Sequence, residues 1–228
     1  MTERALARLV SLVGPRVNAA SEKWLFLPGA SGRVDFWRPL SERLSERGAR
    51  RFFGWPGFGG LPPDPSVNGI ADLASLVVAE ISEPVELFAQ SMGGIIALLA
   101  ALERPKLVRH LVLSATSGGI DMSGFAAQDW RQEFRRQNPD LPTWFEDERW
   151  DLSERLREIY VPVLLLWGDA DPISPVAAGE RLRELLPDAE LVVLRGGSHD
   201  LAMERADEIL PHVERHLSKS PARKSVRC

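Results

Sequence analysis

The sequence predicts an α/β fold in which helices flank a mostly parallel sheet of about six strands. Short apolar runs alternate along the chain with longer amphipathic stretches, the pattern of repeated strand–helix units. The runs are continuously apolar, which indicates strands that are covered on both faces of the sheet. The 228 residues are enough for one domain with a single core, expected over residues 1–218.

The predicted elements follow one another in order along most of the chain. Strands are expected at residues 24–27, 51–53, 85–89, 111–114, 163–167 and 191–194. Helices are expected at residues 35–47, 68–80, 92–103, 176–186 and 203–217. A further helix is expected at residues 3–13, where apolar residues recur on one helical face.

One connection departs from this alternation. Residues 118–158 separate two predicted strands and are too many for a simple loop. The segment contains six aromatic residues: Phe125, Trp130, Phe134, Trp144, Phe145 and Trp150. We expect it to form a short helical lid with an apolar underside.

Charge and composition narrow the set of partners. The net charge is −4, and the last ten residues carry four cations and no acid, which leaves the body near −8. An acidic body argues against a nucleic-acid partner, and residues 219–228 are expected to be a basic flexible tail. The single cysteine, Cys228, favours a reducing compartment. With neither a secretory leader nor an apolar run of about 20 residues, we expect a cytoplasmic protein without membrane insertion.

A serine with small neighbours lies between a predicted strand and a predicted helix, in the sequence AQSMGG at residues 89–94. A serine on so tight a turn needs small residues two positions away, and Ala89 and Gly93 supply them. The turn would raise the Ser91 hydroxyl out of the sheet and aim the Met92 N–H at a developing oxyanion. The alternative is a strand-to-helix junction without a catalytic role.

Two loops could supply the base and the acid that a serine nucleophile needs. His199 directly follows a predicted strand, where its imidazole could overhang the strand ends. Residues 167–173 follow another strand and offer two carboxylates. Asp171 is preferred as the acid because Pro172 fixes a turn there, and Asp169 is expected to brace the loop through backbone N–H groups. The alternative is that both aspartates only form turns.

The remaining candidates are a small-residue loop and three histidines. The loop at residues 28–32 follows the first strand, and the Ala30 N–H is expected to be a second oxyanion donor; the alternative is a plain tight turn. His110 begins a strand and is expected to be structural. His212 and His216 have a spacing that can bind metal, but no third ligand is evident. We expect no metal and no organic cofactor.

In this order along the chain, the oxyanion loop, Ser91, Asp171 and His199 resemble the α/β-hydrolase superfamily. The resemblance covers about residues 24–217. The AQSMGG turn is similar to the family's nucleophile elbow, Gly-x-Ser-x-Gly, with alanine at the first position.

Three further loops carry the resemblance. Residues 167–175 are close to the family's acid loop, in which the aspartate before proline is the triad acid, and residues 196–199 are close to its histidine loop. Residues 54–59 resemble a later loop that usually begins with aspartate, here Gly54.

Two departures from the family stand at the start of the chain. The His-Gly that precedes the oxyanion loop is here Pro28-Gly29. The two antiparallel strands that usually open the fold are expected to be absent and replaced by the helix at residues 3–13.

The resemblance implies a serine esterase of the carboxylesterase type, acting on a small, partly apolar substrate. Ser91 would attack an acyl carbonyl, His199 would carry the proton, and Asp171 would orient the imidazole. Ala30 and Met92 would hold the oxyanion. We expect the substrate pocket to include Ser31, Trp130, Phe134 and Trp144.

The same fold and triad carry other chemistry, so three alternatives stay open. The first is a carbon–carbon lyase or hydrolase, like the menaquinone-pathway lyase, with the triad as a proton-transfer base. The second is a carrier-protein methyl esterase like that of biotin synthesis, in which Arg131, Arg135 and Arg136 could meet an acidic partner. The third is a binding protein on a degenerate hydrolase scaffold, which the intact Ser, His and Asp argue against.

Overall fold

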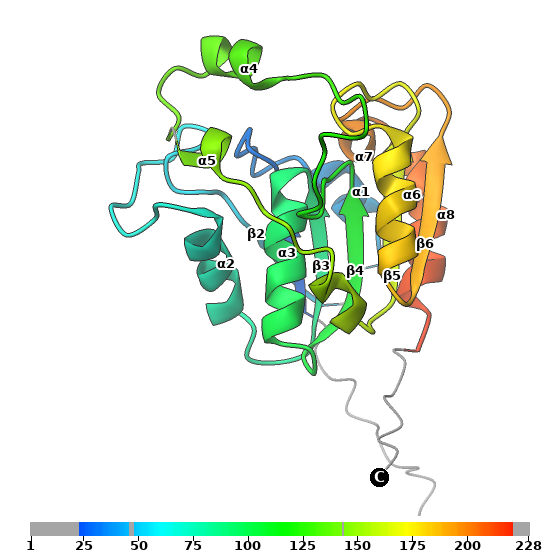
Figure 1. The fold of residues 1–228 in the computed structure, drawn as a ribbon. Coiled ribbons are helices and arrows are strands. Elements are labelled where there is room, and N and C mark those ends of the chain that lie inside the picture. The colour runs from blue at the N-terminus through cyan, green and yellow to red at the C-terminus, as the bar shows by residue number, and fades with distance from the viewer. Residues whose placement is uncertain (1–22, 46–47, 143, 221–228) are drawn as a thin grey trace, which may run out of the picture.

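Six parallel strands form one sheet in the order β2-β1-β3-β4-β5-β6 (Figure 1). The computed structural model describes residues 23–45, 48–142 and 144–220. The strands are β1 (Lys23–Leu27), β2 (Ala49–Phe52), β3 (Val85–Gln90), β4 (Val108–Ser114), β5 (Val163–Gly168) and β6 (Ala189–Leu194). This confirms the predicted six-stranded sheet. The helix expected at residues 3–13 and most of the expected basic tail lie outside the described residues.

Alternate side chains of the strands fill two separate cores. In β1, Leu25 and Leu27 belong to the core on one face, and Trp24 and Phe26 belong to the core on the other. All six residues of β3 are buried, as are all six of β5. Burial on both faces explains why these strands read as continuous apolar runs rather than as alternating patterns.

Helices cover both faces of the sheet. Apolar residues of α2 (Ile70–Ala79), α3 (Met92–Glu103) and α6 (Val176–Leu185) belong to one core. Those of α1 (Arg38–Arg43), α7 (Leu201–Glu204) and α8 (Ala206–Leu217) belong to the other. Figure 1 shows the first set in front of the strands and the second set behind them.

Two helix predictions need correction. The helix expected at 35–47 is confined to α1, because turns occupy residues 34–37 and Pro39 stands at the helix start. The helix expected at 203–217 is two helices, because Arg205 leaves the helical conformation at φ −123° and ψ 39°. The Arg205 guanidinium donates to the carbonyl of Arg195, 2.7 Å away.

The connection from β4 to β5 contains α4 (Arg131–Gln137), α5 (Trp144–Asp147) and the 3-10 turn η1 (Arg155–Glu158). Figure 1 shows α4 beyond the carboxyl ends of the strands, standing off from the rest of the domain. This placement agrees with the position expected for a lid. None of the helices in the described ranges combines the length and apolarity needed to cross a bilayer.

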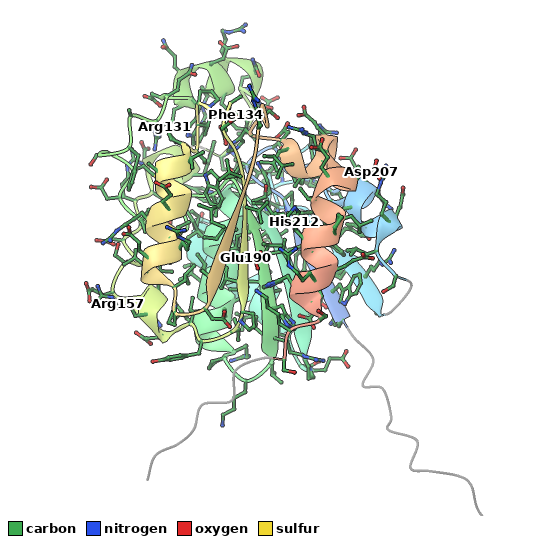
Figure 2. The ribbon with its side chains drawn as sticks, turned by 90° about the vertical axis from the view of Figure 1, so that its right-hand side faces the viewer. Arg131, Phe134, Arg157, Glu190, Asp207 and His212 are labelled. Carbon is green, nitrogen blue, oxygen red and sulfur yellow. The ribbon has the colours of Figure 1, made fainter. Side chains whose placement is uncertain are left out.

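A buried group of polar residues lies at the end of the sheet opposite to the carboxyl ends of the strands. The His110 Nδ1 is 2.7 Å from the Glu86 carboxylate, and its Nε2 is 2.8 Å from the Lys219 carbonyl oxygen. The His216 ring lies edge-on to His110 with the centroids 5.3 Å apart, and its side chain is fully buried. Beside it, Glu190 of β6 accepts from Lys219, 2.9 Å away; Figure 2 marks Glu190 next to α8. His110 is therefore structural, as expected.

His216 makes the stability of the fold depend on pH. Burial, together with the neighbouring His110, lowers the pKa of His216 from 6.5 to about 3. As the pH falls from 6.5 toward about 3, His216 is therefore protonated in the unfolded chain and stays neutral in the folded chain. We expect the free energy of unfolding to fall by up to about 1.4 kcal/mol per pH unit there from this group.

The variant His216→Phe, which keeps an aromatic ring and cannot be protonated, should flatten this dependence. Urea unfolding at several pH values between 6.5 and about 3 measures the free energy of unfolding. His212→Phe, on the same helix, is the control. Parallel stability–pH curves for wild type and His216→Phe would contradict the assignment.

Candidate active site

The residues singled out in the sequence gather at one edge of the sheet. Ser91 directly follows β3, Asp171 follows β5 and His199 follows β6. The loop with Ala30 follows β1. Because the strands are parallel, their carboxyl ends meet at the same edge, where ligands bind in open α/β sheets.

Ser91 occupies a strained turn between β3 and α3. Its backbone has φ 52° and ψ −120°, a conformation that side-chain-bearing residues rarely adopt. Gly93 makes the turn possible, since a Cβ there would lie 2.6 Å from the Pro28 oxygen and 2.9 Å from the Leu27 oxygen. Both atoms are backbone and cannot rotate away. The close approach of strand and helix required by the AQSMGG motif is thus present.

The loop after β1 lies directly against this turn. A Cβ on Gly29 would stand 2.3 Å from the Gln90 side-chain oxygen and 3.0 Å from the Ser91 Cβ. The Trp55 indole N–H donates to the Pro28 carbonyl 3.0 Å away, so the loop is fixed from its other side. Sequence reasoning missed Trp55, although it lies in the loop at residues 54–59 that carried part of the family resemblance.

Asp171 and His199 form a direct pair. The His199 Nδ1 is 2.8 Å from Asp171 Oδ2, with Asp171 fully buried and His199 19% exposed. The other carboxylate oxygen accepts from the backbone N–H groups of Ile173 at 2.8 Å and Ser174 at 3.1 Å. Three hydrogen bonds thus fix the carboxylate, and the imidazole keeps its Nε2 for another partner.

The acid and histidine loops are locked together. A Cβ on Gly168 would lie 2.0 Å from the Gly197 oxygen, so the two backbones touch. The Ala170 N–H donates to that same oxygen at 3.1 Å, and the Gly196 N–H donates to the Asp169 carboxylate. Asp169 therefore braces the loop as expected, and Asp171 is the aspartate that pairs with His199.

The serine is not hydrogen-bonded to the histidine. Among the described residues, the Ser91 hydroxyl has no hydrogen-bond partner. Hydrogen bonds of catalytic groups are often long or misaligned in proteins without substrate and tighten once it binds. In the structure, the Asp171–His199 pair is therefore formed, and the serine follows a neighbouring strand at the same edge of the sheet.

Aromatic residues of the lid segment pack on one another and on the loop after β2. Phe145 contacts Phe58 and Trp130, with ring centroids 5.4 and 5.8 Å apart. Trp144 lies 5.7 Å from Phe58, and Phe134 lies 5.5 Å from Trp130. These five residues form one aromatic cluster, and it belongs to the same apolar core as Met92 and Ala30.

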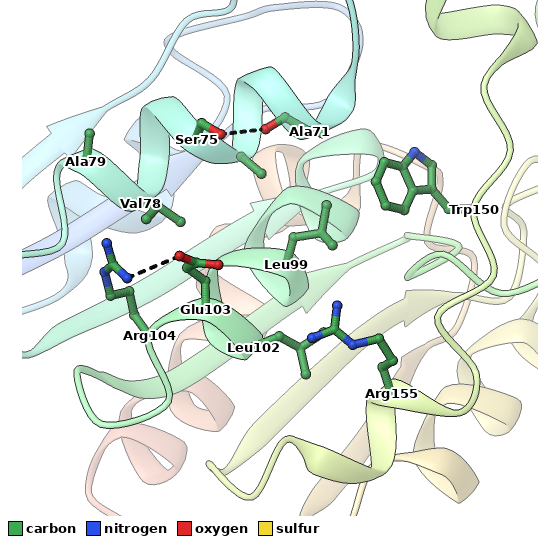
Figure 3. Close-up of a pocket in the computed structure, with 11 residues that line it drawn as sticks. Ala71, Ser75, Val78, Ala79, Leu99, Leu102, Glu103, Arg104, Trp150 and Arg155 are labelled. Atoms are coloured by element: carbon green, nitrogen blue, oxygen red, sulfur yellow. Dashed lines mark hydrogen bonds and ion pairs between the residues drawn. The ribbon is translucent and has the colours of Figure 1, made fainter.

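Two grooves on the described surface lie away from Ser91. The first, of about 430 Å³, runs between α2 and the carboxyl-terminal half of α3, with Leu99, Trp150 and Arg155 among its walls (Figure 3). The second, of about 440 Å³, is lined by the proline-rich loop at residues 54–65. Neither includes Ser31, Trp130, Phe134 or Trp144, so the substrate pocket stays a prediction. No three histidine, cysteine or acidic residues among those described are grouped to hold a metal.

The chain belongs to the alpha/beta hydrolase family, which it matches over residues 24–145 and 118–211. It is 27% identical to a pimeloyl-[acyl-carrier protein] methyl ester esterase of Neisseria meningitidis serogroup C, over 67% of this chain and 76% of that protein. A protein of the same name from Legionella pneumophila is 24% identical, over 76% and 89%.

Solved structures share the fold. MenH from S. aureus superposes with a TM-score of 0.70 at 18% identity, covering 87% of this chain and 94% of that one. An esterase from Thermogutta terrifontis gives 0.69 at 19% identity, covering 89% and 92%.

The substitution Gly93→Ala tests the close approach beneath Ser91. The added methyl group would meet two backbone oxygens, so strand and helix must separate. We expect a loss of stability of about 1–3 kcal/mol and a loss of any Ser91 reactivity. Gly124→Ala is the matched control, because nothing lies within 4 Å of its new Cβ. Thermal unfolding of both variants measures the difference, and equal stability would refute the packing argument.

Proposed function

We propose that this hydrolase cleaves an ester or similar acyl bond through an acyl-enzyme on Ser91. The observation that carries the proposal is the 2.8 Å bond between His199 and the buried Asp171 beside the strained Ser91 turn. His199 takes the Ser91 proton as the hydroxyl oxygen bonds to the acyl carbon. The proton then passes to the leaving alcohol, and the acyl group stays on Ser91.

Water completes the cycle. His199 removes a proton from water, the hydroxide bonds to the acyl carbon, and the proton returns to Ser91 as the acid leaves. Asp171 holds the imidazole in the tautomer with Nε2 free to accept, and stabilises the imidazolium that forms in each half of the reaction. A buried carboxylate suits this role because its attraction to the His199 imidazolium acts at short range and away from water.

Two backbone N–H groups would hold the oxyanion. Met92 is the first residue of α3, where N–H groups have no partner within the helix. The Ala30 N–H makes no hydrogen bond within the described residues, and its neighbour Gly29 packs against Ser91. The helix end adds a favourable field for negative charge.

The proposed substrate is a small molecule with an apolar acyl or alkyl part, in the cytoplasm. The aromatic cluster of Phe58, Trp130, Phe134, Trp144 and Phe145 supports an apolar substrate part. Methyl ester esterases among the relatives support ester chemistry, since their names state that reaction.

A carrier-protein ester is the second candidate, favoured by the names of those same relatives. Its acidic carrier would need cations on the lid. Arg131 is paired with Asp129 at 3.2 Å, and Arg136 with Glu133. Arg135 donates to the Leu141 carbonyl, 2.7 Å away. Figure 2 places Arg131 and Phe134 on this outlying segment. A carrier would have to compete with these internal partners, so we favour the small-molecule ester.

Covalent labelling by a fluorophosphonate tests the nucleophile. We expect the probe to modify Ser91, located by peptide mapping, and both Ser91→Ala and His199→Ala to lose the label. Hydrolysis of p-nitrophenyl esters should fall by at least about a thousandfold in the same variants. A well-folded wild-type chain that resists the probe would refute the proposal and bring the lyase and binding-protein alternatives forward.

The aromatic cluster should set acyl preference. Trp130→Ala removes a large apolar wall, so KM should rise for p-nitrophenyl hexanoate more than for the acetate. Trp150→Ala is the matched control, since this tryptophan lies in the same segment but lines the groove between α2 and α3. The ratio of kcat/KM values for the two esters is the measurement. An unchanged ratio in Trp130→Ala would remove the cluster from the substrate site.

A further inference from the structure

A buried threonine outside the triad holds the backbone of the proposed nucleophile. Thr116 follows β4 and is fully buried. Its hydroxyl donates to the carbonyl oxygen of Ser91, 2.6 Å away. The same hydroxyl oxygen accepts from the Gly118 N–H at 3.0 Å, so its only proton is directed at Ser91.

The carbonyl that Thr116 contacts belongs to the peptide of the proposed oxyanion donor. A trans peptide is planar, so the Ser91 C=O and the Met92 N–H point in opposite directions within one rigid unit. Holding the carbonyl therefore sets the direction of the N–H. The helix contributes one further bond, from the Gly94 N–H at 2.9 Å.

A glycine close to Ser91 leaves room for the contact between Thr116 and the Ser91 carbonyl. A Cβ on Gly94 would lie 2.4 Å from the Thr116 hydroxyl oxygen and 2.6 Å from the Thr116 Cβ. The second glycine of AQSMGG is thus explained by the threonine beneath it, just as the first is explained by the oxyanion loop. Alanine at position 94 would therefore displace Thr116.

The segment that carries Thr116 is also hydrogen-bonded to the loop of Asp171. Ala115, the residue before it, has a left-handed backbone with φ 47°. Its carbonyl accepts from the Ser174 hydroxyl at 3.0 Å, and the Ser174 N–H donates to Asp171. One short segment is therefore bonded to the Ser91 turn on one side and to the Asp171 loop on the other.

We propose that Thr116 is a positioning residue that orients the Ser91–Met92 peptide, and with it the oxyanion donor. The inference rests on the proposed acyl-enzyme function. Its consequence lies in the transition state, because the N–H is aimed at an oxygen that becomes negative only when Ser91 has attacked. Loss of the hydroxyl should lower kcat and leave KM unchanged.

The test separates the hydroxyl from the volume of the side chain. Thr116→Val keeps the shape without the donor, Thr116→Ser keeps the donor without the methyl group, and Thr116→Ala loses both. We expect kcat on p-nitrophenyl butyrate to fall about tenfold in the valine and alanine variants and to be retained by serine. The inhibition constant of a trifluoromethyl ketone, which forms an oxyanion on Ser91, should rise by the same factor as kcat falls.

Ser114→Ala is the matched control. Its buried hydroxyl stands two residues away and has no hydrogen-bond partner within the described chain, so kcat should stay at the wild-type value. Retained kcat in Thr116→Val would overturn the proposal, as would an equal loss in Thr116→Ser, which would indicate packing alone. Fluorophosphonate labelling of the wild type keeps the two proposals apart. A wild type labelled at Ser91 with a flat Thr116 series refutes this inference only, and an unlabelled wild type refutes the function itself.

Discussion

The close contact between the start of α3 and the end of β1 is the constraint on which the active-site edge depends. Gly93 touches the backbone oxygens of Leu27 and Pro28, and no side chain fits between them. This contact seats the start of α3 on the end of β1, directly after the positive-φ Ser91 and beside the loop at residues 28–32. Such a backbone costs about 1–3 kcal/mol. The fully buried β3 on one side and the buried face of α3 on the other hold it in place.

Buried polar groups sit at both ends of the sheet, and they differ in access. At the carboxyl end, Asp171 is enclosed but its partner His199 is 19% exposed. At the other end, His110 and Glu86 are both buried and His216 is fully enclosed. The proton transfer that we propose for His199 requires an imidazole that a substrate can reach. Burial instead lowers the pKa of His216 to about 3, so this histidine stays neutral near neutral pH and contributes to packing.

The sequence allowed the sheet and the contact between Asp171 and His199 to be predicted because both depend on local patterns. Parallel strands read as apolar runs, and their carboxyl ends share an edge, so Asp171 and His199 could be paired without coordinates. The break at Arg205 could not be foreseen, since neither glycine nor proline stands at residues 204–206 to mark it. Thr116 was missed for a similar reason: a single threonine after a strand has no local signature. The role that we propose for it rests on its fit against Gly94 and its bond to the Ser91 carbonyl, which need coordinates.

The connection between β4 and β5 does two things at once. Its first residues, Ala115 and Thr116, are bonded to the Ser174 hydroxyl and to the Ser91 carbonyl. Its later residues carry most of the aromatic cluster, which packs on Phe58 from the loop after β2. In the proposed reaction, one continuous segment thus sets the direction of the oxyanion donor and supplies the apolar surface for the substrate. A change in its path would reach both. It would also reach the loop that carries Asp171, because Ala115 accepts from the Ser174 hydroxyl and the Gln128 N–H donates to the Pro172 carbonyl, 2.7 Å away. In the proposed reaction, acyl selectivity, oxyanion stabilisation and the position of the acid are therefore linked through the backbone of this one segment.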